Sequence, residues 1–162
     1  MEPANQVTAA PSSGSSEQSF YRNILENMSD GVYFVDTKRR ITYWNKAAGT
    51  LSGYPAAEVI GRTCHDNILV HTDSDGCQLC MEGCPLQATF KDMQSREGLM
   101  FLKHKRGHRV PVHVHVSPIV DETGRVIGGV EVFRDESAKF VALERAKQME
   151  KLALMDPLTA VG

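Results

Sequence analysis

The chain has 162 residues, with 18 lysines and arginines against 20 aspartates and glutamates, so its formal net charge is -2. This length suits one domain with short flanking segments, large enough to build a core without covalent staples. The slightly acidic charge excludes the strong positive field that collects nucleic acid or anionic membrane, so we expect neither as a partner. The sequence has no apolar run of the roughly 20 residues that span a bilayer and no secretory pattern at its start, which predicts a cytoplasmic protein.

The first segment, residues 1–18, is rich in Ser, Ala, Pro and Gly and holds almost nothing apolar. Such a composition is typical of a disordered leader. From Ser19, an expected N-cap, Phe20, Ile24 and Met28 recur every four residues. This period predicts a short amphipathic helix.

Two β-rich runs follow, GVYFVD and RITYWN, divided by the turn-like DTKR, which predicts a hairpin. The segment after them breaks into short helical pieces, and a further helix is predicted from Pro85 to about Met93. The last third holds three more β-rich runs separated by turns. We therefore predict an α+β fold built on a five-stranded antiparallel sheet interrupted by helices.

The segment 137–155 has no Gly or Pro and is dominated by good helix formers. Within it, Ala142, Ala146, Met149 and Ala153 fall at spacings of four, three and four. This narrow apolar seam suits a partner helix. The sequence thus predicts a long exit helix that pairs with its copy in a homodimer.

The order of these elements and two stretches of residues resemble the PAS family of sensor domains. In WNKAAGTLSGYPAAEVIGR the matching residues are Asn45, Ala47 or Ala48, Gly53, Tyr54, Glu58, Ile60 and Gly61. In the three-strand finish they are Gly107, Gly124, Gly128 and Asp135. The resemblance covers about residues 20–136. It implies a PAS-like sheet with short helices on one side, flanked by an N-terminal helix and a long C-terminal signalling helix.

The last residues, LMDPLTAVG, resemble the start of a GGDEF domain, the module of diguanylate cyclases. Asp156, Leu158 and Thr159 match, whereas Ala160 and Val161 depart from the usual Gly and Leu. The resemblance implies that the full-length protein is a diguanylate cyclase, which makes cyclic di-GMP. The catalytic residues of that domain are absent from this chain, so we expect no enzymatic activity from the chain alone. The predicted organisation is a leader at 1–18, a sensor domain at 19–136, an exit helix at 137–155 and a truncated GGDEF-like start at 156–162.

Every cysteine falls in the stretch CHDNILVHTDSDGCQLCMEGCP; they are Cys64, Cys77, Cys80 and Cys84. Two residues separate Cys77 from Cys80 and three separate Cys80 from Cys84, spacings that let neighbouring thiolates reach one metal. Four thiolates suit zinc or an iron–sulfur cluster, with His65 and His71 as substitute ligands. We therefore predict that the four cysteines converge on one metal site.

Two other interpretations of the cysteines stay open. The CQLC segment also suits a reversible dithiol, and hence a thiol–disulfide switch. Plain core packing is the third interpretation, because cysteine is also a small buried hydrophobe. From a different class of function, a cysteine-dependent thiol–disulfide oxidoreductase remains an alternative. Against it, such enzymes place the dithiol after a strand of a parallel unit, whereas this chain offers hairpins.

PAS domains also hold flavin or haem, and the sequence argues against both. Cys64 lies near the adduct cysteine of the flavin-binding relatives, where Gly61 and Arg62 match but His65 and Asp66 do not. The helix predicted after the cysteines offers no histidine as an axial haem ligand. The predicted function is therefore a sensory module that detects a metal, redox or small-ligand signal. It would pass this signal through the exit helix to a diguanylate cyclase domain.

Overall fold

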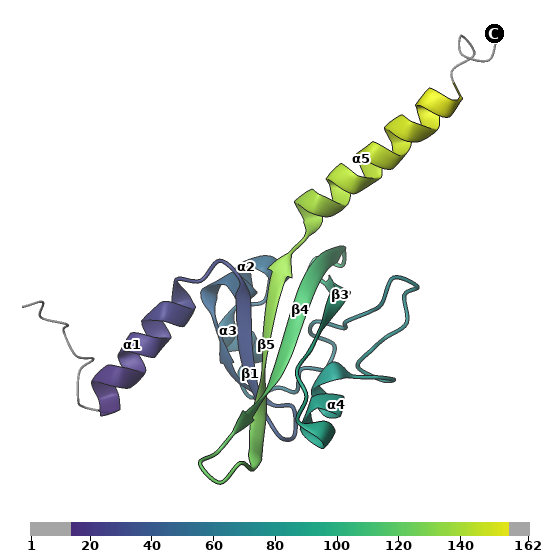
Figure 1. Ribbon diagram of the computed structural model, residues 1–162. Coiled ribbons are helices and arrows are strands. Elements are labelled where there is room, and N and C mark those ends of the chain that lie inside the picture. Colours follow the sequence, from purple (N-terminus) through teal and green to yellow (C-terminus); the bar gives the residue numbers. More distant parts are fainter. Residues whose placement is uncertain (1–13, 156–162) are drawn as a thin grey trace, which may run out of the picture.

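The computed structural model describes residues 14–155 (Figure 1). The first elements are α1 (Gly14–Glu26), β1 (Gly31–Asp36) and β2 (Ile41–Trp44). The short helices are α2 (Lys46–Ser52), α3 (Ala56–Val59) and, beyond the cysteine-bearing stretch, α4 (Pro85–Asp92). The last elements are β3 (Arg96–Lys103), β4 (Arg109–Val120), β5 (Val126–Asp135) and α5 (Ser137–Leu154).

The five strands form one antiparallel sheet in the order β2-β1-β5-β4-β3, so β5, the last strand in sequence, lies at its centre. Tyr33 of β1 lies opposite Glu131 of β5, and Val114 of β4 lies opposite Phe133 of β5. Residues directly opposite each other share a face of the sheet. Helix α2 contacts β1, α3 contacts β2, and α4 contacts both β4 and β5. The predicted fold class, a five-stranded antiparallel sheet with short helices and a helix at each end, is confirmed.

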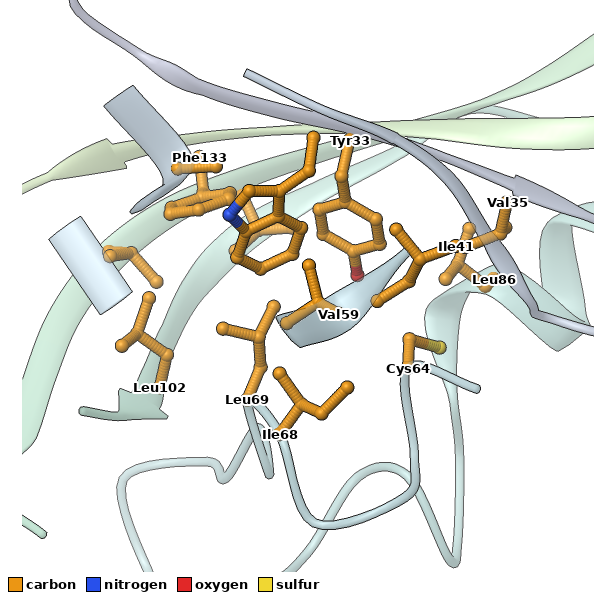
Figure 2. Packing of buried hydrophobic residues seen from close by; sticks show 14 of the residues in the cluster. Tyr33, Val35, Ile41, Val59, Cys64, Ile68, Leu69, Leu86, Leu102 and Phe133 are labelled. Atoms are coloured by element: carbon orange, nitrogen blue, oxygen red, sulfur yellow. The ribbon is translucent and has the colours of Figure 1, made fainter. Parts of the chain in front are cut away.

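The core lies on the inner face of the sheet, which the short helices and the cysteine-bearing stretch cover (Figure 2). The Tyr33 ring packs 5.4 Å from that of Trp44 and 6.2 Å from that of Phe133, measured between centroids. The alternation expected in the fourth strand is confirmed, since its inward residues are all buried: Val110, Val112, Val114 and Val116. Cys64 also belongs to this core, together with Ile68 and Leu86 (Figure 2).

Asn45 ties the N-terminal helix to the sheet and the first short helix. Its Oδ1 accepts hydrogen bonds from the backbone N–H groups of Val32 (2.9 Å) and Ala48 (2.8 Å). Its Nδ2 donates to the backbone carbonyls of Leu25 (2.9 Å) and Asp30 (3.0 Å). The side chain is buried and makes four hydrogen bonds, so it fixes the N-cap of α2 and the end of α1 together.

The first helix begins at Gly14, before the expected start at Ser19. Residues 14–18 of the predicted leader are therefore helical, and residues 1–13 lie outside the described part. Ser19 is an interior helical residue rather than an N-cap, since its Oγ donates to the carbonyl of Ser15 at 3.0 Å. The predicted start of the helix at Ser19 is wrong for a physical reason. Ser, Glu and Gln are polar but still tolerate helical backbone, so a polar composition does not by itself indicate disorder.

The exit helix α5 leaves the sheet directly from β5 and projects away from it (Figure 1). It has no buried residue, and its first turn touches the sheet through Phe140, whose ring centroid lies 6.0 Å from that of Phe101. The predicted seam at Ala142, Ala146 and Met149 is exposed, as is Ala153. Pairing of this seam with a second copy stays a prediction. Among the helices between residues 14 and 155, none has the length and apolar character that crossing a lipid bilayer requires.

Candidate functional site

The cysteine-bearing stretch is attached to the edge strand β3 by backbone hydrogen bonds. Thr72 and Phe101 exchange N–H to carbonyl bonds of 2.9 Å in both directions, and the N–H of Lys103 donates to the carbonyl of Leu69 at 2.7 Å. These bonds extend the sheet edge and turn His71, with Thr72 and Leu69, into the interior, where all three are buried. The stretch thus covers the core and delivers an imidazole into it.

The loop that follows is closed by an aspartate. The Asp73 carboxylate accepts hydrogen bonds from the backbone N–H groups of Asp75 and Cys77, each at 2.9 Å. Such side chain to backbone bonds stabilise a turn locally. The Asp73 carboxylate therefore stabilises this turn from within the loop.

Three of the four cysteines meet at one cavity of about 10 Å³ in the core. The reactive and charged side chains around it are Tyr33, Cys64, His71, Cys80, Cys84 and Glu131. Cys64 and Cys84 are buried, Cys80 is half-buried, and Cys77 is exposed and does not line the cavity. Of the two histidines proposed as substitute ligands, His71 lines the cavity and His65 is exposed outside it.

A buried ion pair joins this cavity to the central strand. The His71 Nε2 lies 3.1 Å from the Glu131 Oε1, and the two side chains are only 8% and 4% exposed. The Tyr33 hydroxyl donates to the other carboxylate oxygen, Oε2, at 2.7 Å. Neither His71 Nε2 nor Glu131 Oε1 makes an aligned hydrogen bond to any of the described residues, so the pair is held by charge and proximity. Burying such groups is costly unless they are paired, which makes this cluster an exception within an apolar core.

The environment of His71 favours its charged form. Burial alone would lower the pKa of His71, but the Glu131 carboxylate and, secondarily, Cys80 raise it to about 10. The imidazole therefore carries a proton at neutral pH. Burial and the nearby Glu131 raise the pKa of the Tyr33 hydroxyl, which keeps that group a neutral donor.

The cavity cysteines differ in acidity. Burial works to raise the pKa of the Cys80 thiol, but hydrogen bonding to His71 and its charge outweigh burial and lower that pKa below its ordinary value. Burial, followed by the charge of Glu131, raises the pKa of the Cys64 thiol well above its ordinary range. Cys80 is thus the more nucleophilic of these two thiols at neutral pH, because the thiolate is the reactive form.

The arrangement does not bring together the predicted set of four metal ligands. Among residues 14–155, the structure places no group of three or more His, Cys, Asp or Glu side chains so that they could hold a metal ion. A site formed by all four cysteines requires the exposed Cys77 to move inward. Such a site for zinc or an iron–sulfur cluster stays a prediction.

Two members of the cluster, Glu131 and Tyr33, were absent from the sequence-based candidates. The signal for Glu131 lies in the last strand, where it occupies an inward position between Gly129 and Phe133. A carboxylate at an inward-facing position of a central strand needs a buried partner. Tyr33 could not be separated from an ordinary core aromatic without knowing that it lies opposite Glu131.

A family model of the PAS fold matches residues 19–135, which is most of the chain, so the chain belongs to the PAS fold family. It is 26% identical over 140 residues to the signal transduction histidine-protein kinase AtoS of Escherichia coli (strain K12), covering 85% of this chain and 21% of AtoS. It is 29% identical over 143 residues to the two-component system protein A of Emericella nidulans, covering 80% of this chain and 19% of that protein. The chain thus spans about a fifth of the length of these two relatives.

A solved structure has the same fold. The crystal structure of the PAS domain of a protein from Colwellia psychrerythraea matches with a TM-score of 0.61 and 22% identity, over 73% of this chain and 95% of that one. The predicted PAS domain is confirmed, and this chain is a sensory PAS module of signal transduction. The two relatives named above are a histidine kinase and a two-component protein, so a diguanylate cyclase output is not shown. The GGDEF-like residues 156–162 lie outside the described part of the chain.

Proposed function

We propose that this PAS module senses a redox, metal or small-ligand signal at its core cysteines and transmits it through α5. The observation that carries the proposal is the position of Glu131. This residue contacts His71 of the cysteine-bearing stretch and belongs to β5, and α5 begins two residues after β5 ends. A change of charge at the thiols therefore reaches the strand that leads into the exit helix.

The junction between β5 and α5 offers contacts that such a change can alter. The Asp135 carboxylate accepts a hydrogen bond from the N–H of Ser137 at 2.7 Å, and the N–H of Glu136 donates to the carbonyl of Pro111 at 2.9 Å. Beyond them, the Phe140 ring packs against Phe101 of the sheet. A lightly held junction can be biased by a coupling free energy of about 1–3 kcal/mol, the usual scale between two sites.

The size of the cavity favours a small signal. Pockets for drug-sized ligands typically measure about 300–1,000 Å³, whereas the space at the cysteines is about 10 Å³. Oxidation of the thiols requires the least rearrangement of this core. Metal binding is the second candidate, favoured by the clustering of all four cysteines, and it requires movement of Cys77. Haem or flavin would require the core to open around it.

The resemblance of the last residues to a GGDEF domain favours a diguanylate cyclase that follows α5, while the relatives named above suggest a kinase. In either case α5 is the connection, and its exposed seam supports pairing with a second copy. A thiol–disulfide oxidoreductase is disfavoured, because the cysteines lie beside an antiparallel sheet rather than after a strand of a parallel unit.

Limited proteolysis tests the proposal. The purified chain is digested in three states: reduced, oxidised, and reduced with added zinc. Cleavage is followed at the turn from Asp73 to Gly76 and within α5. We expect at least one treatment to change the cleavage rate in both regions relative to the reduced state. Equal rates in both regions under all three conditions would refute sensing at this site.

A further inference from the structure

The cavity is lined by the buried ion pair of His71 and Glu131. His71 Nε2 and Glu131 Oε1 belong to side chains more than nine-tenths buried, and neither atom makes an aligned hydrogen bond to a described residue. One is a donor and the other an acceptor. A space of about 10 Å³ beside them is close to what one water-sized molecule needs. The site therefore suits only a very small, polar molecule.

Cys80 connects this cavity with the surface. It is half-buried and lines the cavity, whereas Cys64 and Cys84 line it from buried positions. Cys77, two residues closer to the N-terminus in the same CQLC segment, is exposed and lies outside the lining. A small molecule arriving from solvent thus meets Cys80 first, next to a protonated imidazole.

From this geometry we propose that Cys80 is a peroxide-reactive thiol, which hydrogen peroxide reaches from solvent at the half-buried side of the cavity, and that its oxidised form condenses with Cys84. This inference rests on the proposed sensing function and specifies its signal. Hydrogen peroxide is the smallest hydroperoxide, and both its oxygens donate and accept hydrogen bonds. Bulkier organic hydroperoxides have less room to approach the half-buried Cys80 thiol.

The chemistry balances with peroxide as the only added reactant. The Cys80 thiolate attacks one peroxide oxygen and the O–O bond breaks. The leaving hydroxide takes the proton of His71, which yields Cys80 sulfenic acid, water and a neutral imidazole. The Cys84 thiol then attacks the sulfenic sulfur, and its proton leaves with the displaced hydroxide as a second water. Two thiols are oxidised to one disulfide as one peroxide is reduced to two waters.

Cys84 is the better partner for two reasons. It lies on the same short segment as Cys80, separated by three residues that include Gly83, which has a left-handed φ of 86°. It also occupies the N-cap of α4, so its sulfur is delivered to the cavity by a helix end. Cys64 lies on another segment, where its N–H donates to the carbonyl of Arg39 at 2.9 Å, and burial raises the pKa of its thiol.

The test follows oxidation of the anaerobically purified chain by low hydrogen peroxide and by tert-butyl hydroperoxide. Sulfenic acid is trapped with dimedone, and disulfides are mapped by mass spectrometry. In the unmodified chain we expect the first adduct on Cys80, a Cys80–Cys84 disulfide without the trap, and oxidation by the organic peroxide slower by about tenfold or more. Cys80→Ser should lose the rapid oxidation by hydrogen peroxide, whereas the matched variant Cys77→Ser should keep it. In a His71→Asn variant the rate should fall by about 100-fold, the usual scale for a lost proton donor.

First modification at Cys77 or Cys64, equal rates with both peroxides, or a disulfide that leaves out Cys84 would each overturn the proposal. Because the adduct map of the unmodified chain identifies the reacting thiol directly, the test does not depend on how well a variant folds. Failure of the peroxide proposal can be told apart from failure of the sensing function. If peroxide chemistry is ruled out but zinc still changes proteolysis within α5, the sensing function stands.

Discussion

The carboxylate of Glu131 and the imidazole of His71 lie 3.1 Å apart in the core, although they are far apart in the sequence. His71 belongs to the stretch that carries the cysteines, and Glu131 belongs to the strand that continues into the exit helix. In the proposed function, their contact links the cysteines to the strand that leads into α5.

Replacing Glu131 by Gln should remove the charge that holds the His71 proton. The pKa of His71 should fall from about 10 toward or below the ordinary value of about 6.5, because burial then acts with little opposition. An NMR titration of the imidazole resonances measures this directly. Glu97→Gln is the control, since Glu97 is exposed and lies 3.6 Å from the exposed His115. A His71 pKa unchanged by Glu131→Gln would contradict the assigned cause.

The same pair predicts how stability depends on pH. The pKa of His71 is raised in the folded state, so protonation of His71 stabilises the fold. This contribution to the free energy of unfolding is complete below about pH 6.5 and is lost as the pH rises through about 10. Cys80, whose pKa is lowered, contributes with the opposite sign, so the comparison uses a Cys80→Ser background. Between pH 7 and 9 the free energy of unfolding of the Cys80→Ser variant, measured with urea, should fall by on the order of 1 kcal/mol or more. Adding Glu131→Gln should flatten that slope.

Asn45→Ala should destabilise the domain by about 2–4 kcal/mol, because four backbone groups lose a buried partner at once. Urea denaturation measures the loss. Asn23→Ala, on the exposed side of α1, serves as the control and should change stability by no more than about 0.5 kcal/mol. Similar losses in the two variants would show that Asn45 is not the tie between α1, β1 and α2.

Gly128→Ala should be strongly destabilising, whereas Gly98→Ala should be tolerated. A Cβ at position 128 would overlap the carbonyl oxygen of Val35 on the neighbouring strand, and backbone cannot move aside cheaply. A Cβ at position 98 would meet nothing within 4 Å. We expect a loss of about 1–3 kcal/mol for Gly128→Ala and nearly none for Gly98→Ala. Equal melting temperatures for the two variants would count against this packing of β1 on β5.

The seam on α5 predicts weak dimerisation. Ala146 and Met149 are exposed in the single chain, and their small area suits close but modest packing. Replacing both by Glu should shift the sedimentation profile toward monomer while the circular dichroism of the sheet stays the same. The paired variant Glu144→Gln and Lys147→Gln changes charge on the same helix away from the seam and should leave the profile unaltered.

Periodicity predicted the fold well because the core follows it. Local sequence alone predicts both the strand with alternating residues from Val110 to Val116 and the helix after Asp135, because each pattern depends only on neighbouring residues. The start of α1 was missed because polar residues at a helix end resemble a polar loop. Composition alone does not separate these two states.

The candidate site was predicted in part. Clustering of the cysteines identified the stretch, and the structure brings Cys64, Cys80 and Cys84 to one cavity. Sequence spacing could not show that Cys77 points outward, since that depends on the turn closed by Asp73. It also could not pair His71 with a glutamate of the last strand, because long-range contacts are set by strand order rather than by local pattern.

Hydrogen exchange measured by mass spectrometry, on the reduced chain and on the chain oxidised with hydrogen peroxide, tests most directly whether the state of the cysteines reaches the exit helix through Glu131. We predict that oxidation changes the exchange rate both in residues 71–84 and at the junction of β5 with α5, from Asp135 to Phe140. In Glu131→Gln the change in residues 71–84 should persist while the change at the junction is lost. Exchange that differs only in residues 71–84 of the unmodified chain would contradict the account.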